Sequence, residues 1–137
     1  MTLPTLIAKL EEAKGADRAL DAAIVIALDI RPEAFRKDKT PLVPGESGAL
    51  VQVGKGGPTI EVQRYTESLD TALTLVPEGW SRGLLAWPGY DGGLLVGEAK
   101  AVLRHITSSG GEPSVRAFAA TLPLALCIAA LRARLPS

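Results

Sequence analysis

Hydrophobic residues near the start of the chain recur at the spacing of one helical face. They occupy every third or fourth position from Leu3 to Leu10, which predicts an amphipathic helix. Gly15 is typical of a helix end, and Asp17 is a favoured cap for the start of a second helix. The stretch Ala22–Leu28 is apolar on all sides, so we expect this second helix to be deeply buried.

Residues 31–48 show no periodicity and are rich in proline and charge, which predicts a long loop. Loops of this length are uncommon in compact domains and are often functional or mobile. Its basic residues have two interpretations, a solvated loop or a mobile lid over an anionic ligand, which Phe35 would help to close. These residues are Arg31, Arg36, Lys37 and Lys39.

Two strands are predicted at residues 49–53 and 59–65, joined by the glycine-rich turn 54–58. The glycines of this turn also suggest a phosphate-binding loop. However, their spacing departs from the Walker pattern, and Gly56 stands where serine or threonine would hold magnesium. The simple hairpin is therefore the favoured interpretation.

A short helix follows, capped by Ser68 or Thr66. Residues 80–87 predict another strand, and residues 94–106 predict one long strand or two, with Gly97 as a bulge. Turn-forming residues separate these segments.

The last element is a helix over residues 122–134, with Thr121 as its cap. Together the elements predict one α+β domain spanning residues 1–137. We expect a single antiparallel sheet of about four to five strands, with the N-terminal helices, the short central helix and the C-terminal helix packed on it.

Composition narrows the functional classes. Fifteen basic residues balance fifteen acidic ones, and this zero net charge argues against a general nucleic-acid binder. A single cysteine excludes an internal disulfide and a cysteine zinc site, and a single histidine excludes an all-histidine metal cluster. The longest apolar run, Leu122–Leu131, is about half of a membrane span. We therefore expect no metal, no cofactor and a cytoplasmic location.

The densest polar cluster is the segment from Tyr65 to Asp70, at a strand-to-helix junction. Free N–H groups and hydroxyls at such a junction can hold an anion or a ribose hydroxyl. Plain capping, with Thr66 or Ser68 bonding the backbone and Tyr65 covering the sheet edge, is the alternative.

Aromatic residues gather around the strand at 80–87. Trp80, Trp87 and Tyr90 flank it, and Arg82 lies between the two tryptophans. An aromatic ring beside an arginine can stack on a base while the guanidinium pairs with a phosphate. Core packing of the tryptophans is the alternative.

His105 and Cys127 carry the weakest catalytic signals. His105 has no recognisable carboxylate or nucleophile at a characteristic spacing, so a structural role is favoured over a general base. Cys127 lies within an apolar helix, where a thiol is inert.

Three segments in order resemble a known family. They are LDAAIVIAL at residues 20–28, YTESLDTAL at 65–73 followed by VPEGW at 76–80, and TLPLALCIAALRAR at 121–134. Together they resemble the small bacteriophage and prophage proteins that carry a phage ABA-sandwich-like domain. The resemblance implies a phage accessory protein that interferes with host defence. It establishes no enzyme activity, so it assigns no catalytic residue.

We therefore expect a non-enzymatic protein that sequesters an anionic small molecule, such as a nucleotide immune signal of the host, in the host cytoplasm. Homo-oligomers would help to form such a site. The alternatives are an anti-CRISPR-like inhibitor that binds a host defence protein, and a small nucleotide hydrolase using His105. The expected ligand contacts are Tyr65, Thr66, Ser68, Arg82, Trp87, Tyr90, Arg104 and Arg116.

Overall fold

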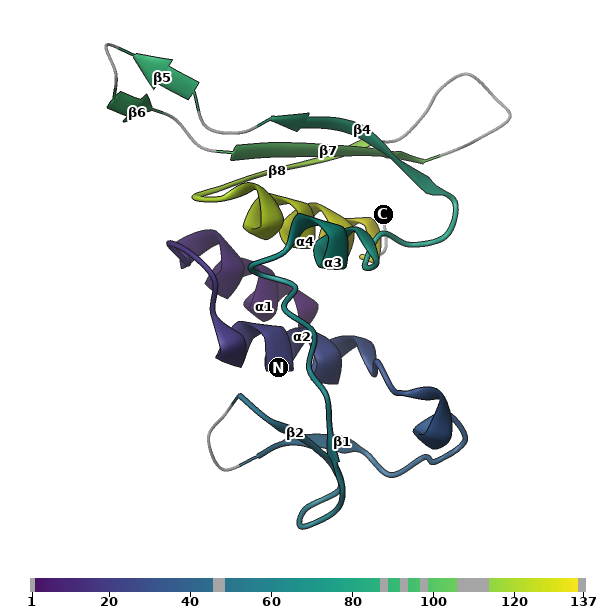
Figure 1. Cartoon of the computed structure of the whole chain (residues 1–137). Helices are drawn as coiled ribbons and strands as arrows, with labels where there is room; N and C mark the ends of the chain where they lie inside the picture. Colours follow the sequence, from purple (N-terminus) through teal and green to yellow (C-terminus); the bar gives the residue numbers. More distant parts are fainter. Residues whose placement is uncertain are drawn as a thin grey trace.

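The computed structural model describes residues 2–45, 49–86, 89–91, 94–96, 99–105 and 114–135 of the chain. Its helices lie between two small antiparallel sheets (Figure 1). The helices are α1 (Leu3–Glu12), α2 (Arg18–Leu28), α3 (Leu69–Leu73) and α4 (Leu122–Ala133), with a short 3₁₀ turn at Glu33–Phe35.

The first sheet has the strand order β1-β2-β3 and the second the order β4-β7-β8, while β5 and β6 form a separate hairpin. Their bounds are β1 (Leu42–Pro44), β2 (Val51–Val53), β3 (Thr59–Ile60), β4 (Trp80–Ala86), β5 (Gly89–Asp91), β6 (Leu94–Val96), β7 (Ala99–His105) and β8 (Ser114–Ala119). All described strand pairs are antiparallel.

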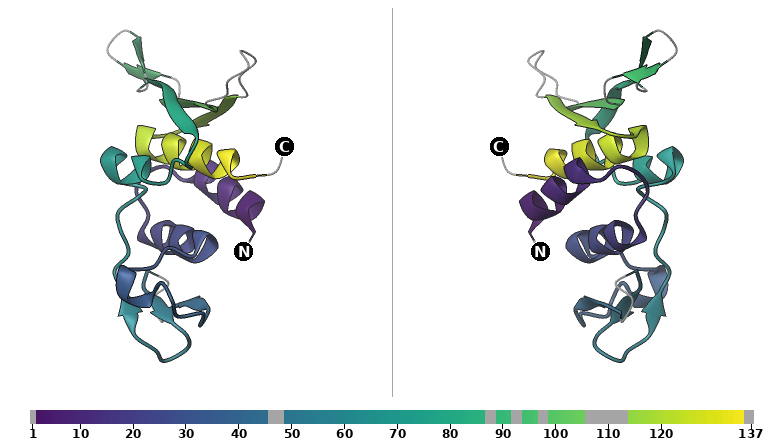
Figure 2. Two further views of the ribbon diagram at one scale, coloured as in Figure 1. Left: turned by 90° about the vertical axis from the view of Figure 1, so that its right-hand side faces the viewer. Right: turned by 90° about the vertical axis from the view of Figure 1, so that its left-hand side faces the viewer.

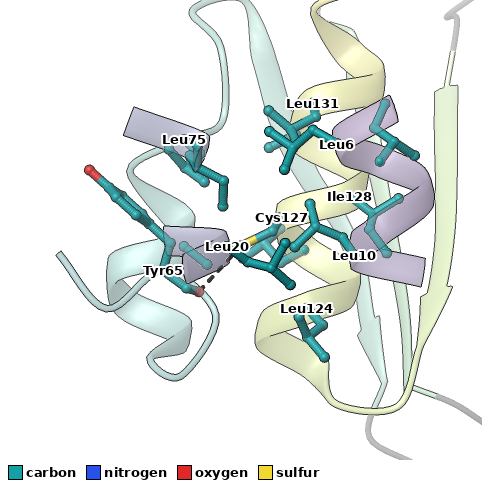
Figure 3. Close-up of a cluster of buried hydrophobic side chains, with 14 of the residues drawn as sticks. Leu6, Leu10, Leu20, Tyr65, Leu75, Leu124, Cys127, Ile128 and Leu131 are labelled. Atoms are coloured by element: carbon teal, nitrogen blue, oxygen red, sulfur yellow. Dashed lines mark hydrogen bonds between the residues drawn. The ribbon is translucent and has the colours of Figure 1, made fainter. Parts of the chain in front are cut away.

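Helix α4 is the centre of the core. All ten residues from Leu122 to Leu131 are buried, so the helix has no solvent-facing stripe over this length. It packs against β7 and β8 on one side and against α1 and α3 on the other. Leucines from α1 and the side chains of α4 interdigitate in this cluster (Figure 3).

Small residues on the sheet allow α4 to approach closely. Ala99 and Ala101 of β7 face Ala119 and Ala117 of β8 directly across the strand pair, and all four are at most 2% exposed. Leu103 fills the next position along β7. Over these four positions the inner face of the sheet is therefore made of small side chains, and the helix supplies the bulk.

The expected helices are confirmed. The side chains of Asp17, Ser68 and Thr121 each accept a hydrogen bond from a backbone N–H in the first turn of α2, α3 and α4. The hairpin at 54–58 is also confirmed, because β2 and β3 pair directly and Gly54 and Gly56 supply the positive φ angles of the turn.

The prediction of a single sheet is wrong. The strand expected at 59–65 ends at Ile60, and the chain then runs through residues 61–64 without strand pairing toward α2 and α3. This departure divides the strands into two sheets. Strand β8 was not predicted, although the residues of Ser114–Ala119 alternate between outward and buried positions.

The segment expected to be a loop at 31–48 contains strand β1, which pairs with β2. Arg31 joins the start of this segment to its middle: its guanidinium donates to Asp29 at 2.9 Å and to the Thr40 carbonyl at 2.6 Å. Phe35 packs partly against the core. Mobility of the segment stays a prediction, and Gly97 lies outside the described residues.

In the part of the chain that the structure describes, no helix combines the length and the apolar character that a membrane crossing requires.

Shortening one buried side chain of α4 tests whether this helix is the centre of the core. We predict that Leu126→Ala lowers the free energy of unfolding by about 2–5 kcal/mol, because Leu126 is fully buried and the cavity cannot close. Urea denaturation measures this. Leu50→Ala is the control, since Leu50 is 48% exposed and should lose little. Equal losses at the two positions would contradict the proposed core.

Candidate functional site

The first two residues of the predicted polar cluster at 65–70, Tyr65 and Thr66, are buried, whereas Glu67 and Asp70 are exposed. Thr66 is 1% exposed, and its N–H and hydroxyl both donate to Oδ1 of Asp21 at 2.8 Å. The same hydroxyl accepts the N–H of Asp17 at 2.8 Å. Thr66 is therefore fully occupied in joining its segment to the start of α2.

Arg18 holds Asp21 from the other side. We call the connection formed by Arg18, Asp21 and Thr66 the buried joint. Its guanidinium pairs with Oδ2 of Asp21 at 2.9 Å and donates to the carbonyls of Val62 at 2.7 Å and Gln63 at 3.3 Å. Asp21 itself is only 1% exposed. A buried carboxylate needs such partners, and here both oxygens have them.

Tyr65 and Cys127 make a second internal contact (Figure 3). The thiol of Cys127 donates to the Tyr65 carbonyl at 3.2 Å. Burial raises the pKa of the Cys127 thiol well above its ordinary value, and Asp21 adds to the effect. Burial, with Asp21 and Cys127, also raises the pKa of Tyr65. The thiol is therefore held in its neutral, unreactive form.

The contribution of the buried joint to stability can be tested by comparing two ion pairs. Arg18–Asp21 and Arg64–Glu67 are both Arg–acid pairs three residues apart, but only the first has a buried carboxylate. We predict that Asp21→Ala lowers the free energy of unfolding by about 3 kcal/mol. Glu67→Ala should cost less than about 1 kcal/mol.

Urea denaturation of both variants measures the difference. Similar costs at Asp21 and Glu67 would show that the buried joint does not hold the fold together.

A cleft of about 640 Å³ lies beside this joint, between the two residues that precede β2 and the segment after β3. Ser68 lines it, but its hydroxyl accepts from the N–H of Thr71 at 3.3 Å as the α3 cap. The arginines in its wall are Arg18 and Arg64, and both already pair with carboxylates. Glu61 adds a negative charge to the same wall. The cleft therefore has no excess positive charge for an anion.

The outward face of the sheet β4-β7-β8 has a different character. Register places Lys100 opposite Phe118, Val102 opposite Arg116, and Arg104 opposite Ser114, all on the side away from α4. The side views show the helices on the other side of this sheet (Figure 2). We call this set of residues on β7 and β8 the basic sheet face.

Three cations lie on the basic sheet face, and no acidic residue occupies its described positions. Arg104 and Arg116 are exposed, and within the described residues neither they nor Lys100 forms an ion pair. Phe118 is 49% exposed, with Nζ of Lys100 lying 5.8 Å from the centre of its ring. A half-exposed aromatic ring beside cations suits a ligand that carries both a base and phosphates.

The structure thus separates the residues expected to act together. Arg104 and Arg116 lie on the basic sheet face, Ser68 lines the cleft, and Tyr65 and Thr66 are buried. Arg82 lies in β4 opposite Leu103 and Tyr90 in β5 opposite Leu95, but the positions of their side chains lie outside the description. Trp87 lies outside the described residues.

Sequence analysis missed Lys100 and Phe118. The missed signal was the alternation in β8, since a strand at 114–119 puts Arg116 and Phe118 on one face. The register with β7 then adds Lys100 and Arg104 to that face.

His105 packs edge-on against Trp80, with ring centres 5.2 Å apart. Its Nδ1 is buried and has no hydrogen-bond partner among the residues that the structure describes. A general base needs that nitrogen oriented, so the described surroundings of His105 favour a packing role.

Across the residues that the structure describes, no group of three or more His, Cys, Asp or Glu is placed to hold a metal ion.

No protein-family model matches the chain, and comparisons with curated proteins and with solved structures found no match either.

Proposed function

We propose that this protein binds a phosphate-bearing ligand of the nucleotide class on the basic sheet face, without converting it chemically. One observation carries the proposal: Lys100, Arg104 and Arg116 share one sheet face with the half-exposed ring of Phe118, and no described acidic residue there neutralises them.

The chemistry of these groups supports this ligand class. Guanidinium groups donate several hydrogen bonds to phosphate oxygens, and Arg104 and Arg116 are both exposed to do so. An aromatic face attracts a base by stacking, at low cost in side-chain entropy. The cleft beside Ser68 suits an anion less well, because carboxylates already balance its arginines.

Sequestration is the biological role that we propose for this binding. The family resemblance supports it by implying a phage accessory protein that interferes with host defence, and we propose that the protein interferes by withholding a nucleotide signal in the host cytoplasm. The ligand would then be released unchanged when the protein is denatured.

Thermal melts against a panel of nucleotides, including ATP and cyclic dinucleotides, test the proposal. A ligand at about a hundred times its dissociation constant adds about 2.7 kcal/mol of stability. For a domain of this size, we predict a rise in Tm of roughly 5–10 °C. The double variant Arg104→Gln/Arg116→Gln should abolish the rise and leave the Tm of the free protein nearly unchanged, because both side chains are exposed.

Arg36→Gln/Lys37→Gln is the charge-matched control, since these exposed cations lie far along the chain from β7 and β8. It should keep the full rise in Tm. Equal loss in both double variants would indicate nonspecific charge effects, and recovery of a chemically altered nucleotide would indicate an enzyme. Either result would contradict the proposal.

A further inference from the structure

We infer that the ligand of the basic sheet face is a single-stranded nucleic acid several nucleotides long, and not a free mononucleotide. The inference rests on the proposed function, since it names the ligand of the same face. Its evidence is the spacing, the shape and the composition of that face.

The cations are spread along the strands at a spacing that suits several linked phosphates. Lys100 and Arg104 are four residues apart along β7, which corresponds to about 13 Å. Arg116 lies opposite Val102, between them in register, on a neighbouring strand about 5 Å away. A chain of linked phosphates can reach all three cations, whereas a single nucleotide phosphate reaches one or two.

The shape of the surface supports a polymer as well. An extended sheet surface gives a chain of linked nucleotides several positions along which to lie. The basic sheet face is the outer surface of a three-stranded sheet whose helices cover the opposite side (Figures 1 and 2).

Phe118 favours a single strand over a duplex. Bases in a single strand are free to stack on an aromatic ring, while those of a duplex are stacked on each other. The ring is 49% exposed and lies directly opposite Lys100, so a stacked base would have its own phosphate near a cation. Groove recognition of duplex DNA instead needs an inserted helix or ribbon.

The zero net charge, which argues against a general nucleic-acid binder, describes the whole chain and not this one face. Coulombic attraction to a phosphate is screened over about 10 Å in ordinary salt, so the charges near the ligand decide. On the described positions of β7 and β8 those charges are three cations and no anions.

Fluorescence anisotropy with a labelled oligothymidylate of about twelve nucleotides tests the inference, since sites of this kind cover about 4–16 nucleotides. We expect the oligonucleotide to bind at least about tenfold more tightly than thymidine triphosphate, which is used as an unlabelled competitor. The logarithm of the association constant should fall linearly with the logarithm of salt concentration, with a slope of about −2 for three phosphate contacts.

Two kinds of variant separate the two kinds of contact. Arg104→Gln or Arg116→Gln should each reduce the salt slope by about 0.7, because one phosphate contact is lost. Phe118→Ala should weaken binding at least about fivefold and leave the slope unchanged, because stacking releases no counterions. Leu50→Ala is the control, since Leu50 is a similarly exposed apolar side chain that directly precedes β2 of the other sheet. It should change neither quantity.

The outcomes distinguish the inference from the proposed function. If thymidine triphosphate and the oligonucleotide bind equally well and both depend on Arg104 and Arg116, the inference fails and the proposed function stands. If neither binds, both fail. If duplex DNA binds as tightly as the single strand and Phe118→Ala has no effect, the face is a general polyanion surface and the inference is overturned.

Discussion

Helix α4 has no polar side over the ten residues from Leu122 to Leu131, and all of them are buried. A helix that is apolar all round must be covered all round. The sheet β4-β7-β8 covers one side, and α1 and α3 cover the other. This constraint organises the molecule, because every helix that contacts α4 must lie on the same side of that sheet.

The exposed sheet face follows from the same constraint. With its helices gathered on the inner side, the sheet presents alternate residues of β7 and β8 outward. Alternation along each strand separates two kinds of residue. Small alanines face α4, and cations with Phe118 face outward. One face of the β7–β8 pair thus packs in the core, and the other face forms the proposed binding surface.

The buried joint around Asp21 connects helix α2 to the chain segment that follows the first sheet. Arg18 and Thr66 hold the carboxylate between α2 and the segment that leads from β3 to α3. Of the polar residues predicted at 65–68 as ligand contacts, Thr66 belongs to this joint and Ser68 caps α3. The clustering of these polar side chains is therefore explained by contacts inside the protein.

Local signals made much of the fold predictable. Asp17, Ser68 and Thr121 act within one helical turn, so their roles are visible in the sequence. Sheet partners depend on contacts between distant residues, and nothing local shows that the strand at 59–65 ends at Ile60. The basic sheet face was only half predictable for the same reason. Arg104 and Arg116 were found as isolated cations, but the register that adds Lys100 and Phe118 is a tertiary property.

The central claim is that a nucleotide-class ligand binds the outward face of β7 and β8. Mapping of backbone amide NMR shifts during titration with an unlabelled oligothymidylate tests this claim most directly. The account predicts that the largest shifts fall at Lys100, Arg104, Arg116 and Phe118, with little change around the cleft beside Ser68. Shifts concentrated at residues 59–71, with β7 and β8 unchanged, would contradict it.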